Sequence, residues 1–248
     1  MNVVFAMLKA FENIGQLEPE RRKPRVHPLD ADTHPLDFTV RLARTEDRIL
    51  QAVKIREAGF DRHHPWHFID KADRRDRQFG SVVFVTLSKG SEEPLGSLRI
   101  ETNRQRQLSI ESEIKLPSKY HGLHCAHVSR LSTVPGGGGR QCRNALFKAL
   151  YLYSVATEIR YLFVLALPPI ERLYYRIGFQ EVFKNGNRLL PQQYRDLNLH
   201  LLSVQVDQLR LRLKSRSPEL YQFIFLQRHP DIRIFESVSN SWETFRKK

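Results

Sequence analysis

Four consecutive glycines, Gly136 to Gly139, stand between an apolar stretch and a long helical pattern, and Arg140 and Arg143 follow them. Glycines before a helix let backbone N–H groups turn toward an anion, and the unpaired N–H groups of the first helical turn add a positive field. The segment therefore predicts either a cradle for a phosphate or pyrophosphate or a flexible glycine loop. It is neither a Walker loop nor a dinucleotide fingerprint, because GxxxxGK[ST] and GxGxxG with a later ribose-binding acid are both absent.

The charge of the chain indicates what kind of partner it attracts, and its cysteines indicate the redox compartment. The chain has 40 Lys and Arg against 27 Asp and Glu, a formal net charge of +13, which attracts nucleic acid, anionic lipid or an acidic protein. Cys125 and Cys142 have neither metal-ligand nor disulfide spacing, which favours a reducing compartment. The histidines before Asp70 lack a zinc pattern, so no metal is expected. No apolar run approaches the ~18 residues of a membrane span.

The elements that position the glycine segment follow from apolar periodicity. Residues 1–15 predict an amphipathic helix that either caps the domain or touches a membrane surface, and residues 16–36 predict an extended arm. A helix follows from a Thr45 cap to about Ala58. We expect Ile49, Leu50, Val53 and Ile55 to be available to the core. The predicted strands of this half are 38–42, 81–87, 95–101 and 127–134.

The second half begins with the long helix after the glycines and a continuous apolar strand at Tyr161–Leu167, typical of a sheet centre. A short helix ended by Gly178 comes next. Ser217-Pro218-Glu219 predicts a helix start, with Ser217 as N-cap. We also expect strands at 179–183 and 199–206, the latter the last clear strand, and a helix from Leu209. The predicted domains are an N-terminal helix and arm at 1–36, a central domain at 37–206 and a C-terminal helical appendage at 207–248.

This order of elements resembles the GNAT N-acyltransferase fold, an α/β fold with a mixed central sheet and helices on both faces. The motifs that support the resemblance are Val134-Pro135-Gly136-Gly137-Gly138-Gly139-Arg140 and Leu173-Tyr174-Tyr175-Arg176-Ile177-Gly178-Phe179. In that family the glycine loop holds the phosphate or pyrophosphate of an acyl-pantetheine donor. The resemblance therefore implies that Val134, Gly136, Gly137, Gly138, Gly139 and Arg140 bind phosphopantetheine. It also implies that Tyr174 protonates the departing thiolate, and the alternative is a core tyrosine with a bonded hydroxyl.

A narrower resemblance covers roughly residues 38–185. Arg56 with Phe60, the pair Asp73 and Asp76, Gly96-Ser97-Leu98-Arg99 and Val128-Ser129-Arg130 are similar to N-acyl amino acid synthases of the FeeM type, which are related to LuxI-type autoinducer synthases. The resemblance implies transfer of a long fatty acyl chain from acyl carrier protein to the α-amine of an amino acid. One position departs from the pattern, because His127 stands where these families commonly have glutamate.

His127 suits the proton transfer that such a reaction needs, since an amine must lose a proton to attack a thioester and histidine titrates near neutral pH. Strand alternation places His127 and Ser129 on one face and Arg130 on the other, unless a bulge intervenes. We expect His127 and Ser129 to belong to the catalytic set. The alternative for His127 is a structural histidine bonded to the backbone.

Arg56, Arg99 and Arg130 occupy positions where core residues would be expected. Either they pair with Asp73 and Asp76 to shape the acceptor site, with one arginine binding the amino acid carboxylate, or they form a purely structural network. Phe60 belongs to the same motif, and with Trp66 and Phe68 it either lines an acyl tunnel or is plain core.

The expected function is thus an acyltransferase with no permanently bound cofactor, whose donor is acyl carrier protein or acyl-CoA and whose acceptor is an amino acid. The alternatives are a GNAT acetyltransferase that uses acetyl-CoA on a small amine or protein lysine and, more remotely, a non-enzymatic nucleic-acid binder. No basic stripe interleaved with aromatic residues supports the latter, so no nucleic acid partner is expected. The expected location is the cytoplasm, with peripheral contact to the inner membrane left open.

Overall fold

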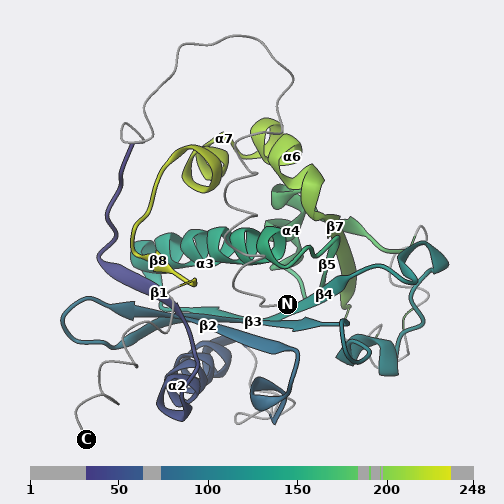
Figure 1. The fold of residues 1–248 in the computed structure, drawn as a ribbon, viewed down its shortest axis with the longest axis horizontal. Helices are drawn as coiled ribbons and strands as arrows, with labels where there is room; N and C mark the ends of the chain where they lie inside the picture. Colours follow the sequence, from purple (N-terminus) through teal and green to yellow (C-terminus); the bar gives the residue numbers. More distant parts are fainter. Residues whose placement is uncertain (1–31, 64–73, 184–189, 191–195, 197, 236–248) are drawn as a thin grey trace, which may run out of the picture.

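The computed structural model describes residues 32–63, 74–183, 190, 196 and 198–235. Within them the chain forms a mixed eight-stranded sheet in the order β6-β7-β5-β4-β3-β2-β1-β8 (Figure 1). The strands are β1 (Phe38–Leu42), β2 (Ser81–Ser88), β3 (Pro94–Thr102), β4 (Cys125–Thr133), β5 (Tyr161–Ala166), β6 (Gln180–Glu181), β7 (His200–Gln205) and β8 (Ile232–Arg233).

Strands β1 to β4 form one antiparallel set, with β8 parallel to β1 at its edge, and β5, β7 and β6 form a second antiparallel set. The two sets meet at the parallel pair of β4 and β5, where only Cys125–His127 pair with Tyr161–Phe163. Beyond His127 and Phe163 the described strands no longer pair with each other. The sheet is therefore opened at its middle, at the carboxyl ends of β4 and β5.

Helices cover both faces, as expected for the predicted fold (Figure 1). Helix α2 (Glu46–His63) lies on one face, and α3 (Gly136–Ala156) spans the other. Outside α3 lie α4 (Glu171–Ile177), α6 (Leu209–Arg216) and α7 (Pro218–Tyr221). The main core fills the layer between α3 and the sheet, with fully buried residues such as Phe84, Leu98, Leu146 and Leu202. Burial of that apolar surface is the main stabilising contribution to this arrangement.

Helix α2 begins where its cap predicts, because the Thr45 Oγ1 accepts a hydrogen bond from the Arg48 N–H at 3.4 Å. It continues five residues past the predicted end, from Ala58 to His63. Ile49, Val53 and Ile55 are buried as expected. The expectation for Leu50 is wrong: its side chain is 51% exposed, because it lies on the solvent side of the helix.

Helix α3 begins at Gly136, so the four glycines form its first turn and not a loop before it. Gly136 has a φ of 82°, a conformation that glycine adopts without strain. A Cβ at Gly139 would lie 1.9 Å from the Val134 carbonyl oxygen, so only glycine fits there. The glycines thus bring the start of α3 against the end of β4.

The chain after β5 follows the prediction in outline. α4 ends at Gly178, whose φ is 100°, and α6 and α7 begin at Leu209 and Pro218. Ser217 precedes α7 as predicted, but its side chain makes no capping hydrogen bond. The predicted strand at 179–183 is only the two-residue β6. A π-helical turn, η6 (Gln222–Leu226), extends α7, and β8 then joins the sheet beside β1.

The described ranges also contain four short 3-10 helices: η1 (Arg74–Arg77), η2 (Ser109–Ser112), η3 (Ser118–Tyr120) and η5 (Val206–Gln208). None of the helices in the described ranges combines the length and apolar character that crossing a membrane requires.

Candidate active site

A bulge in β4 shapes the site. Arg99 pairs with Ser129 and Ser97 pairs with Ser132, so Arg130 and Leu131 together face the single residue Leu98. Arg130 adopts a φ of 58°, and its carbonyl accepts a hydrogen bond from the Ser97 Oγ. The bulge confirms the condition under which Arg130 departs from simple alternation. It lies on the part of β4 that no longer pairs with β5.

A buried network of ion pairs lies under α2, on the sheet face that carries Ser97, Arg99 and Glu101. The Arg56 Nη1 is 2.5 Å from the Asp76 Oδ2, and the Arg99 Nη1 is 3.6 Å from the Asp76 Oδ1. The Arg99 Nη2 is 3.0 Å from the Glu101 Oε1. All four side chains are buried, at 5% exposure or less. The network therefore joins α2, η1 and β3 in one charged cluster.

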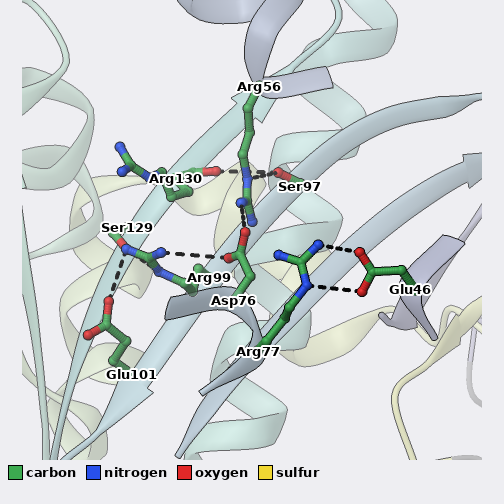
Figure 2. A network of polar contacts seen from close by, with 9 residues as sticks. All are labelled: Glu46, Arg56, Asp76, Arg77, Ser97, Arg99, Glu101, Ser129 and Arg130. Atoms are coloured by element: carbon green, nitrogen blue, oxygen red, sulfur yellow. Dashed lines mark hydrogen bonds and ion pairs between the residues drawn. The ribbon is translucent and has the colours of Figure 1, made fainter. Parts of the chain in front are cut away.

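Neighbouring hydroxyl groups complete the network. Arg56 donates from Nε to the Ser97 Oγ at 3.0 Å, and Arg99 donates from Nε to the Ser129 Oγ at 3.1 Å. Figure 2 shows the guanidinium groups of Arg56 and Arg99 converging on Asp76, whereas that of Arg130 points away from it. Three of the predicted network residues, Arg56, Asp76 and Arg99, thus contact one another. Asp73 and the side chain of Phe60 lie outside the described residues, as do Trp66 and Phe68.

An exposed ion pair holds η1 in place. Arg77 donates to Glu46 from Nε at 3.0 Å and makes a second contact from Nη2, so η1 is tied to the first turn of α2 (Figure 2). Asp76, one residue earlier, faces inward to Arg56. The two contacts together fix the orientation of the only acidic side chain of η1.

His127 lies on the same face of the sheet, directly opposite Glu101 in the antiparallel pairing of β4 and β3. It is 6% exposed, and its Nδ1 shares a hydrogen bond of 3.1 Å with the Ser109 Oγ. Burial, followed by the nearby charges of Arg99, Arg75 and Arg130, lowers the pKa of His127 to about 3. The imidazole is therefore neutral at physiological pH.

The predicted donor-binding residues surround the junction of β4 and α3. No side chain caps the N-terminus of α3. Space is open beside Gly136 and Gly138, whereas the Val134 N–H already donates to the Leu95 carbonyl at 2.9 Å. Arg140 is exposed one turn into the helix. Such an N-terminus can receive an anion. Gly137 lies in the first turn of α3.

Tyr174 of α4 belongs to the main core on the α3 face of the sheet, opposite the face that carries His127. Its ring is 5.3 Å from that of Phe179 and 6.3 Å from that of Phe147, measured between centroids. Burial raises its pKa above the usual value, and the nearby Arg143 opposes that shift. The phenol therefore keeps its proton at neutral pH. The two faces of the sheet are open to each other where β4 and β5 no longer pair.

Two residues of the site carry no sequence motif: Ser109 as a partner of His127, and Glu101 as a partner of Arg99. Ser97 lies in a motif, but its contact with Arg56 was not predicted. Alternation along β3 could have placed Glu101 on the face of Arg99. Its position opposite His127 depends on the register between β3 and β4, which no local pattern specifies.

Comparison by sequence identifies no relative: the chain matches no family model, and no curated protein matches it. Comparison by structure does. The chain resembles FeeM, an N-acyl amino acid synthase from uncultured soil microbes, with a TM-score of 0.57 at 14% identity over 75% of this chain and 96% of FeeM. It also resembles the AHL synthase LasI, with a TM-score of 0.50 at 17% identity over 68% of this chain and 90% of LasI. The chain therefore has the GNAT N-acyltransferase fold that its sequence predicts.

Proposed function

We propose that this protein is an N-acyltransferase that moves a long-chain fatty acyl group from acyl carrier protein to the α-amine of an amino acid. The observation that carries the proposal is the buried cluster of Arg56, Asp76, Arg99 and Glu101 beside the point where β4 leaves β5. Four buried charges are costly in a fold that could pack apolar side chains there, so a role in substrate binding accounts for them.

The donor would lie at the opening between β4 and β5. The unpaired strand edges there can hydrogen-bond the amide groups of a pantetheine arm, as a sheet edge binds an extended peptide. Its phosphate would meet the first turn of α3 at Gly136–Gly139, with Arg140 beside it. Acyl-CoA presents the same arm, so this part of the site serves either carrier.

The acceptor would approach from the α2 side. Arg130 lies at the bulge. Burial is the main cause that lowers the pKa of both Arg56 and His127, and the charge of Arg130 adds to it. The guanidinium of Arg130 could bind the carboxylate of an amino acid. The neutral imidazole of His127 is suited to accept a hydrogen bond from the amine, with Ser129 on the same face.

The reaction joins the amine nitrogen to the thioester carbonyl carbon and breaks the bond from that carbon to sulfur. Tyr174 would then protonate the departing thiolate, because its phenol retains a proton at neutral pH. No bound cofactor is needed for these steps. The amide product and the free pantetheine thiol are released.

The test is a product assay with purified protein. Acyl carrier protein charged with a long fatty acyl chain, acyl-CoA and acetyl-CoA are each offered with the twenty amino acids, and products are identified by mass spectrometry. We expect an N-acyl amino acid from the carrier-protein donor. Consumption of acetyl-CoA alone, with no long-chain amide, would instead identify an acetyltransferase.

A further inference from the structure

Glu101 is a buried acid whose hydrogen-bonding capacity is largely unused. It is 1% exposed, and neither carboxylate oxygen accepts a hydrogen bond from the described residues. The Arg99 Nη2 lies 3.0 Å from Oε1 as an ion pair. A carboxylate has about four acceptor positions, so a buried one without hydrogen bonds has room for a donor. Leaving such a group unsatisfied costs free energy, which indicates that a ligand supplies the donor.

Among the described residues, Glu101 shares its ion-pair partner with a second acid. Arg99 on β3 lies between Glu101 and Asp76 of η1, while Arg56 of α2 pairs with Asp76. Arg75 of η1 and Arg130 of β4 lie near enough to lower the pKa of His127. Glu111 of η2 uses its carboxylate to accept the Leu108 N–H. His127 itself is neutral and supplies no charge.

We propose that Glu101 is the acceptor-binding carboxylate of this site, which holds the ammonium form of a primary amine and takes a proton from it. His127, directly opposite Glu101, accepts a hydrogen bond from the same nitrogen. This inference rests on the proposed N-acyltransferase function. It places the negative charge on β3, across the ladder from the imidazole.

The amine nitrogen loses two protons in the proposed reaction. A primary ammonium loses one proton to Glu101, which frees the nitrogen lone pair for attack on the thioester carbonyl carbon. The nitrogen loses a second proton once the C–N bond has formed, and the C–S bond then breaks. One of the two protons ends on the thiol and the other reaches solvent. Burial favours the first transfer, because it converts an ion pair into two neutral groups.

The test compares two nucleophiles in Glu101→Gln. An amino acid reaches the site as an ammonium, whereas hydroxylamine is neutral near physiological pH and needs no carboxylate to free its lone pair. We expect kcat/KM for the amino acid to fall about 10²- to 10⁴-fold and that for hydroxylamine to fall less than about tenfold. Equal losses for both nucleophiles, or no loss for either, would overturn the proposal. The exposed Glu113→Gln serves as the matched control.

An exchange variant keeps the test decisive if Glu101→Gln is poorly folded. Glu101→His combined with His127→Glu retains one carboxylate and one imidazole on the same pair of facing positions. We expect this variant, checked for folding by circular dichroism, to recover amino acid turnover at least about tenfold over Glu101→Gln. A folded exchange variant with no recovery would count against the role of Glu101. Wild-type protein that acylates neither nucleophile would instead refute the proposed function.

Discussion

Arg56 shows how a buried charge is accommodated in this protein. Burial lowers the pKa of its guanidinium, and the carboxylate of Asp76 opposes that shift. The pairing of Arg56 with Asp76 was predictable, because both belong to a motif and a buried arginine needs a carboxylate. The sharing of Asp76 between Arg56 and Arg99 was not, because it depends on how α2, β3 and η1 come together. Local sequence thus indicates which charges are buried, and tertiary structure decides which of them meet.

His127 gives a prediction about acid stability. Its pKa is about 3 in the folded chain and near 6.5 in the unfolded chain, so between these values the unfolded state binds a proton that the folded state does not. Stability therefore falls as pH decreases through this interval. We expect His127→Gln to reduce the slope of the free energy of unfolding against pH by up to about 1.4 kcal/mol per pH unit. Urea unfolding at several pH values measures this slope.

The comparison for that experiment is His121→Gln, since His121 is exposed to solvent. That substitution removes a histidine from the surface instead of the core, so a difference in slope between the two variants reports on the burial of His127. If His127→Gln shows the wild-type pH dependence, the imidazole of His127 is not kept neutral by the fold.

Elements differ in how far the sequence reveals them. Thr45, Pro218 and Gly178 mark helix ends through their own conformational preferences, and the structure has helix ends at these positions. The first turn of α3 was missed, because glycine is a poor helix former and the turn depends on contact with Val134. β8 was missed for a similar reason: its two residues gain their strand geometry only by pairing with β1.

The contact between α2 and β4 yields a prediction about one glycine. A Cβ at Gly59 would lie 2.1 Å from the Ser132 Oγ, which donates to the Ile55 carbonyl at 3.0 Å. Gly59→Ala should therefore destabilise the protein by about 1 kcal/mol, although the same change in an exposed helix stabilises by a similar amount. The free energy of unfolding measured in urea tests this.

A double-mutant cycle isolates the cause. In Gly59→Ala with Ser132→Ala, the new methyl group meets only the Cβ of residue 132, at an ordinary 3.4 Å. The pair should be coupled, with the second substitution making Gly59→Ala neutral or stabilising. Additive effects of the two substitutions would show that α2 does not approach β4 at this point.

At the scale of the whole molecule, the two ends of the described chain close on each other. The Leu36 N–H donates to the Asp231 Oδ2 at 2.8 Å, and β8 pairs with β1. Lys148 of α3 connects that helix to the segment before β8, since its Nζ lies 3.0 Å from both the Phe223 carbonyl oxygen and the His229 Nδ1. Burial lowers the pKa of Lys148 to about 8. Lys148 is therefore part of the core, and not part of the exposed basic surface.

The basic surface that remains is the basis of a prediction about the donor carrier. Arg140 is exposed at the start of α3, and Arg210, Lys214 and Arg216 are exposed on α6. A carrier protein presents an acidic helical surface, whereas coenzyme A adds only one nucleotide with two further phosphates. Exposed charges chiefly steer association, and salt weakens them as the Debye length falls from about 10 Å at 0.1 M to about 3 Å at 1 M. Acyl carrier protein should therefore outperform acyl-CoA at low salt, and its advantage should shrink as salt rises.

Arg140→Glu tests the place of contact. It should raise the apparent KM for the acyl carrier protein about tenfold or more at low salt, and that for acyl-CoA by less, because reversal of a charge at a docking surface repels the acidic partner. Arg160→Glu is the matched control, since Arg160 is also exposed but lies beyond the far end of the 21-residue helix α3, roughly 30 Å away. Steady-state kinetics with both donors at several salt concentrations measure the effect. Equal kinetics for the two donors without salt dependence, or an equal loss in Arg160→Glu, would show that this surface serves another anionic partner, such as a lipid.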